Sequence, residues 1–132
     1  MIVEEGGSMN AMNVFTEELD VLVKAGQQCS EDAVICHGIV HLFMDAFDAG
    51  QEALRDYMRQ HQSEESAKGT PKELLMDTYE RVIAVPEETW LHMLQDRYHP
   101  DHTEPICQKA ERVCREYIPA FVALRNFMAA PV

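Results

Sequence analysis

The stretch AVICHGIVHLFMDAFDAGQEALRDYMR, residues 33–59, decides the fold of this chain. Its first half is apolar on almost every side of a helix, and its second half keeps an apolar stripe at Phe47, Leu54 and Met58. A helix that is apolar nearly all round must be covered by other helices on several sides. The stretch therefore predicts a long central helix inside a helical bundle.

Four further segments repeat apolar residues every three or four positions, which is the spacing of one helix face. No segment alternates apolar and polar residues for long enough to predict a strand. We therefore predict an all-α fold, a compact bundle of about five helices around a long central helix. The predicted helices span residues 14–25, 30–59, 70–83, 86–98 and 103–128.

Local signals predict where these helices begin and bend. Ser30, followed by two acids, is a good N-cap for the central helix, and residues 70–73 (TPKE) have the sequence of a capping box with proline at the first helical position. Pro119 lies inside the last helix and predicts a kink, because proline removes one backbone hydrogen bond. Gly50 predicts a bend in the central helix, and Gly38, in its apolar half, predicts the close approach of another helix.

The length and the N-terminal sequence predict one domain. At 132 residues the chain is long enough to bury a core without disulfides or metals. Residues 1–13 are rich in Gly, Met and Asn and have no period, so we expect a disordered N-terminal tail and a single helical domain over residues 14–132. Two glutamates stand where a secretion signal would carry lysines, and no run reaches about 18 uncharged apolar residues. We therefore expect a cytoplasmic protein without a membrane span.

The charge is strongly negative and unevenly distributed. The formal net charge is −12, and residues 1–65 hold 13 acids against 3 bases, whereas residues 66–132 hold 10 against 8. Such a charge repels nucleic acid backbones and anionic membranes, so we expect no direct nucleic acid binding and no membrane binding. A basic protein is the complementary partner, although acidity for solubility alone would give the same composition.

The four cysteines, at positions 29, 36, 107 and 114, contain no C-x-x-C motif, which argues against zinc knuckles and thioredoxin-like sites. Each pair is seven residues apart, so both thiols of a pair lie on one face of a helix but too far apart to bridge within it. In a reducing cytoplasm we expect four free thiols that act as small core residues. Disulfides between the two pairs, across helices, are the alternative.

Histidines provide the strongest pattern for chemistry. His37 and His41 are four residues apart on the central helix, and His99, Asp101 and His102 follow together in a later loop. Inward-facing histidines and carboxylates hold zinc or iron in helical bundles, so these five residues are the candidate metal ligands. The chain lacks the H-E-x-x-H and repeated Glu-x-x-His motifs of known helical metal sites. The alternative is that the first pair bonds to neighbouring backbone and that the loop is solvated.

The remaining motifs predict binding rather than catalysis. The chain has no G-x-S-x-G motif and no phosphate-binding glycine loop, so we expect no enzyme and no cofactor. Eight methionines suit adaptable binding surfaces. We therefore expect a small protein-binding regulator that sequesters or inhibits a partner, such as an anti-activator of a transcription factor or an immunity or nuclease-inhibitor protein. The alternative is a helical zinc or iron protein.

Oligomeric state follows from the widths of the apolar faces. The stripes of residues 33–59 and 106–128 are wide for so small a globule, so we expect some of this apolar surface to stay exposed. Symmetric dimers are the commonest way to cover such a face, and we therefore expect a homodimer when no partner is bound.

Overall fold

A computed structural model of the chain describes residues 7–61, 69–70, 73 and 86–130. Every regular element in these ranges is helical, which confirms the all-α prediction. Apart from residues 70 and 73, the predicted helix over 70–83 lies outside the described residues. The described elements are α1 (Gly7–Gly26), α2 (Ala33–His61), α4 (Glu87–Tyr98), α5 (Ile106–Arg112), the π-helical segment η2 (Val113–Tyr117) and α6 (Ile118–Ala129).

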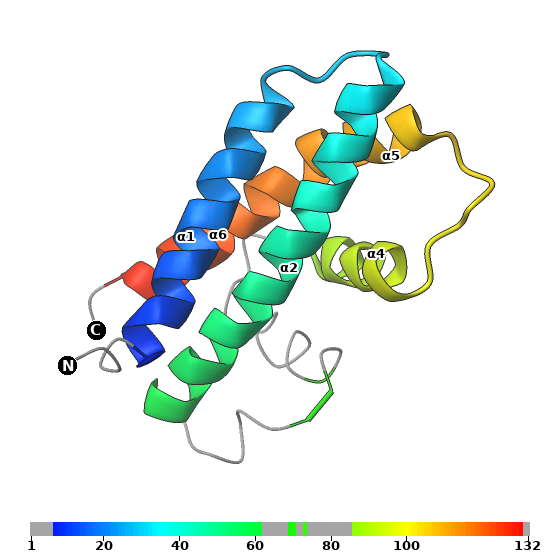
Figure 1. The fold of residues 1–132 in the computed structure, drawn as a ribbon. Helices are drawn as coiled ribbons and strands as arrows, with labels where there is room; N and C mark the ends of the chain where they lie inside the picture. The colour runs from blue at the N-terminus through cyan, green and yellow to red at the C-terminus, as the bar shows by residue number, and fades with distance from the viewer. Residues whose placement is uncertain (1–6, 62–68, 71–72, 74–85, 131–132) are drawn as a thin grey trace.

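α1 and α2 run antiparallel side by side, and the continuous run of α5, η2 and α6 crosses behind them, as Figure 1 shows. Aromatic rings join these layers. The Phe43 ring of α2 lies 4.9 Å from the Tyr117 ring of η2 and 6.0 Å from the Phe121 ring of α6, and Phe15 of α1 contacts Phe121 edge-on. The core therefore lies between the α1–α2 pair and the last helical run.

α2 is the central helix that its sequence predicts. Its buried residues come from its whole length and include Cys36, Ile39, Val40, Phe43, Ala46, Phe47, Ala49, Ala53, Leu54 and Met58. Residues 33–60 are also long and apolar enough to cross a membrane by length and composition alone, a test that the core helix of a soluble protein passes as well. In this structure 44% of the most apolar window of this helix is buried.

The N-terminal ends of α1 and α2 differ from the sequence prediction. α1 begins at Gly7, earlier than the predicted Val14. α2 begins at Ala33 rather than at Ser30, because the Asp32 carboxylate accepts hydrogen bonds from the backbone N–H groups of residues 34 and 35. The Ser30 hydroxyl instead accepts from the N–H of Asp32. Ser30 therefore orders the turn, and Asp32 caps the helix.

The predicted capping box at residues 70–73 is present. The Thr70 hydroxyl accepts from the Glu73 N–H at 3.1 Å, and the Glu73 carboxylate accepts from the Thr70 N–H at 3.0 Å. These are the two reciprocal bonds that define the motif.

The last helical run begins at Ile106 rather than at Thr103. The Thr103 hydroxyl does not cap it, because both the hydroxyl and the N–H of Thr103 donate to the Asp101 carboxylate. Near Pro119, η2 widens the helix, and the Ile118 N–H bonds to the Val113 carbonyl five residues back. The extra residue in this turn accommodates Pro119, which cannot donate a backbone hydrogen bond. The irregularity that Pro119 predicts is therefore a π-helical segment in this structure.

The close approach of another helix occurs at Gly50 of α2 and not at Gly38, where the sequence suggested it. A Cβ atom at Gly50 would lie 3.1 Å from the Phe15 ring, so Gly50 allows α1 to approach. A Cβ atom at Gly38 would meet nothing within 4 Å. The close approach was predicted at Gly38 because the neighbouring residues are apolar, but Gly38 lies on the exposed side of the helix.

Cys36 of α2 and Cys107 of α5 form a disulfide, with their Cα atoms 5.0 Å apart. The prediction of four free thiols was therefore wrong for this pair, and the alternative of a bond across helices is correct for it. Cys29 and Cys114 are free thiols. We predicted free thiols from the reducing conditions of the cytoplasm alone. The packing of α2 on α5 brings the two sulfur atoms together.

Candidate functional site

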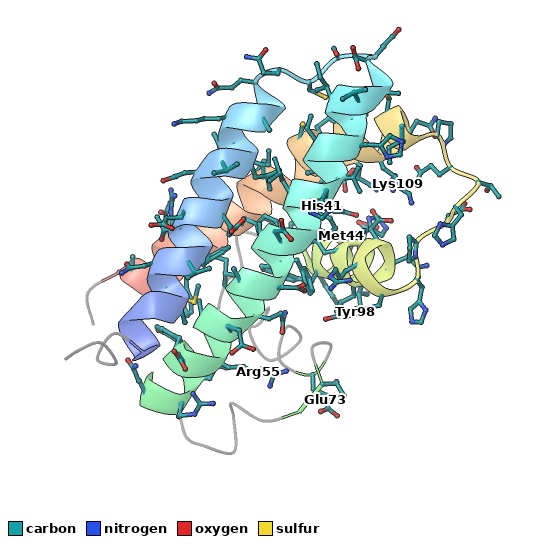
Figure 2. All side chains as sticks on the ribbon, in the orientation of Figure 1. His41, Met44, Arg55, Glu73, Tyr98 and Lys109 are labelled. Atoms are coloured by element: carbon teal, nitrogen blue, oxygen red, sulfur yellow. A yellow bond between two sulfur atoms is a disulfide. The ribbon has the colours of Figure 1, made fainter. Side chains whose placement is uncertain are left out.

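The predicted metal ligands lie apart on the surface. His37 and His41 are exposed on α2, and Figure 2 labels the His41 side chain. The His41 side chain, 74% exposed, lies 3.6 Å from the Asp45 carboxylate. His99, Asp101 and His102 are exposed in the loop between α4 and α5. Among the described residues, no three His, Cys, Asp or Glu side chains are grouped closely enough to hold a metal.

The densest polar cluster lies where α4 meets the last helical run. Arg112 donates two hydrogen bonds to the Glu104 carboxylate, at 2.7 and 2.8 Å, and one to the Asp96 carboxylate at 2.8 Å. The Tyr117 hydroxyl donates to the same Asp96 oxygen at 2.6 Å. Four side chains from α4, the following loop, α5 and η2 therefore form one connected network.

In this cluster the pKa values of Glu104 and Tyr117 are shifted. The hydrogen bonds from Arg112 lower the pKa of Glu104. Burial raises the pKa of Tyr117, and the bond to Asp96 raises it further, so the hydroxyl remains a donor. A cavity of about 380 Å³ opens beside the cluster. The hydrogen bonds between the Arg112 guanidinium and the carboxylates join α4 to the last helical run, so the network fixes these elements against each other.

The outward-facing surface of α1 combines apolar and acidic groups. Val14 and Val21 are 45% and 49% exposed, and Glu17 and Asp20 between them are also exposed. Residues spaced by three, four and seven positions share one face of a helix, so these four side chains form one surface, which we call the α1 outer face.

Five arginines of the described residues pair with acids, and one of these acids is Asp20 of the α1 outer face, which lies 3.5 Å from Arg125. Arg59, Arg97, Arg112, Arg115 and Arg125 each form an ion pair with an Asp or Glu side chain, and Lys109 is buried. By contrast, Glu17, Glu31 and Glu52 are exposed and have no base within ion-pair distance among the described residues. The described residues in the first half of the chain therefore keep uncompensated negative charge.

Sequence reasoning did not single out Arg112, Glu104, Asp96 or Tyr117. Each is an ordinary residue on a predicted helix or loop, and an arginine eight positions from a glutamate carries no recognisable signal. The outer face of α1 was detectable in principle, because Val14 and Val21 lie off the stripe formed by Phe15, Leu19 and Leu22.

No known protein family, curated protein or solved structure matches the chain. Function is therefore inferred from the residues themselves.

Proposed function

We propose that this protein is a small, acidic, cytoplasmic regulator that acts by binding a basic protein and sequestering or inhibiting it. An anti-activator of a transcription factor and an immunity or nuclease-inhibitor protein are the two forms of this function that fit the chain. The observation that carries the proposal is the α1 outer face, where two half-exposed valines lie among acids.

The two components of the α1 outer face serve different parts of recognition. Val14 and Val21 supply apolar surface that water leaves on binding, which gives affinity. Glu17 supplies negative charge that attracts a basic partner and raises the association rate, whereas the charge of Asp20 is partly compensated by Arg125. A helix or strand of the partner that carries lysines or arginines around an apolar centre is complementary to both.

The uncompensated acids outside this face extend the attraction. Glu31 lies in the turn after α1 and Glu52 lies on α2, so negative charge continues over the neighbouring surface. Salt screens such charges beyond about 10 Å at 0.1 M ionic strength. We therefore expect association with the partner to slow as salt rises, while dissociation changes less.

The experiment compares two matched pairs of glutamates. Tagged wild-type protein is used to capture partners from lysate, the captured protein is identified by mass spectrometry and purified, and its binding kinetics are measured at two salt concentrations. Glu17→Gln/Glu31→Gln should lower the association rate, whereas Glu87→Gln/Glu88→Gln, an equal change of charge on α4, should lower it less. Equal effects, or a captured partner that is itself acidic, would refute the proposal.

The valines are tested in the same way. Val14→Ser/Val21→Ser should raise the dissociation rate, while Val34→Ser/Leu91→Ser, two exposed apolar residues on other helices, should leave it unchanged. Thermal unfolding of each variant confirms that the fold is retained.

We also propose that the protein forms a homodimer when no partner is present. The structure buries most of the apolar stripes of α2 and the last helical run, so the surface left for self-association is smaller than the sequence suggested. A dimer through the α1 outer face would bring Glu17 and Asp20 of both copies together, and salt would relieve their repulsion. Light scattering should then show dimerisation that strengthens with salt, opposite in sign to partner binding. A monomer at high concentration and high salt would exclude it.

A further inference from the structure

The four cysteines gather at one end of the molecule, where the turn between α1 and α2 lies next to the start of the last helical run (Figure 1). Cys107 and Cys114 are seven residues apart on that run, so they lie about two helical turns apart on one face. The first of them is bonded to Cys36. The second approaches the turn that contains Cys29.

One carbonyl group connects Cys29 with Cys114. The Cys29 N–H donates to the Gly26 carbonyl at 3.1 Å, and the Cys114 Sγ atom lies 4.0 Å from the same oxygen. Gly26 makes this approach possible, because a Cβ atom there would lie 3.4 Å from Cys114 Sγ and 3.0 Å from the Ile118 side chain. The two free thiols are therefore neighbours although 85 positions separate them in the sequence.

We propose that Cys29 and Cys114 form a dithiol site that reacts with low-molecular-weight disulfides and closes as a second disulfide beside Cys36–Cys107. This inference does not depend on the proposed protein partner. A cavity of about 570 Å³ gives access to Cys29, the first thiol of the site, and it is also lined by Ser30, Glu31, Pro105, Cys107 and Gln108.

The reaction proceeds by two exchanges. The Cys29 thiolate attacks one sulfur of the small disulfide, whose S–S bond breaks, and the departing thiolate takes up the proton that Cys29 released. Cys114, after losing its proton to water, then attacks Cys29 Sγ and expels the second small thiolate, which is protonated in turn. Two protein thiols are oxidised to one disulfide, and one small disulfide is reduced to two thiols.

Exposure and protonation decide the order of the two cysteines. Cys29 is exposed, whereas Cys114 is half-buried. Burial raises the pKa of Cys114 to about 12, and a hydrogen bond with the Cys29 thiol adds to this rise. Cys114 is thus a poor first nucleophile. Once Cys29 is in a mixed disulfide, its thiol no longer raises the pKa of Cys114, which favours the second step.

The test uses full-length protein that is reduced with dithiothreitol, freed of reductant and treated with oxidised glutathione. Thiols remaining at each time are alkylated in denaturant and counted by mass. Trypsin alone leaves Cys29 and Cys36 on one fragment, residues 25–55, so a second cleavage after Glu31 is needed to separate them. Cys114 is recovered on the fragment of residues 113–115.

In wild-type protein we expect all four thiols to be lost, no glutathione to remain, and Cys29 to be linked to Cys114. Cys114→Ser should keep one glutathione on Cys29, and Cys29→Ser should leave Cys114 alkylatable. Stable glutathione on wild-type Cys29, or Cys29 linked to Cys36 or Cys107, would overturn the proposal. The wild-type fragments decide the question even if a variant fails to fold.

Discussion

Replacing Phe43 by alanine should lower the free energy of unfolding by about 3–5 kcal/mol. The Phe43 side chain is 1% exposed, and its ring lies 4.9 Å from Tyr117, 6.0 Å from Phe121 and 6.1 Å from Phe47. Truncation would remove apolar contacts from α2, η2 and α6 together and leave a cavity between layers that cannot easily close. Each aromatic pair is worth about 0.5–1.5 kcal/mol beyond its buried area, so we expect the upper part of the range.

Asp48→Ala is the control on the same helix. Its carboxylate accepts two hydrogen bonds from Arg97, at 3.0 and 2.8 Å, but the side chain is 51% exposed, and exposed ion pairs contribute at most about 1 kcal/mol. Urea unfolding followed by far-ultraviolet circular dichroism measures both variants, with the slope against urea checked for a common unfolded state. Equal losses of stability in the two variants would show that the assignment of α2 faces is wrong.

Three further predictions concern α2 and the polar cluster. Gly38→Ala should raise the free energy of unfolding by about 0.5–1 kcal/mol, because its Cβ atom meets open space. Gly50→Ala should lower the free energy of unfolding, because its Cβ atom crowds an aromatic ring of α1. Urea unfolding that gives Gly50→Ala the higher stability would contradict this. The pKa of Glu104 is lowered in the folded state, so its contribution to stability is present above the unfolded pKa of about 4.3 and is lost as the pH falls through the folded pKa. Glu104→Gln should therefore flatten the fall in melting temperature below about pH 4.3. A fall in melting temperature that is the same in the variant would refute this. For the zinc or iron alternative, any rise in melting temperature on adding the metal should disappear in His37→Gln/His41→Gln, and no rise in the wild type would exclude that metal site.

Several features of the fold were predictable from sequence because they depend on local interactions. The long apolar stretch of residues 33–59 forms the central helix, and Phe47, Leu54 and Met58 of its predicted stripe are buried. Its first half is not covered on every side as predicted, because Val34 is 81% exposed. The capping box at Thr70 and Glu73 involves groups three positions apart. The boundaries were less predictable, because Ser30 and Asp32 are both good N-caps and the geometry of one short turn selects Asp32.

The candidate site was less predictable than the fold. The five proposed metal ligands were chosen by residue type, and the structure leaves them exposed and ungrouped among the described residues because two of them lie on the outer side of α2 and three lie in a separate loop. The polar network around Arg112 joins residues from four segments, and charged residues are too common on helices for such a network to be read from spacing.

The sequence by itself determined the helical class, the central helix and the excess of acid in the first half, because the spacing of apolar residues and the count of charges can be read directly from the chain. Only the tertiary structure decided which cysteines meet, which glycine admits α1 and which acids remain uncompensated. Those outcomes depend on helices packing against one another, and the packing brings Cys36 to Cys107 and Cys29 to Cys114 across more than 70 residues of sequence.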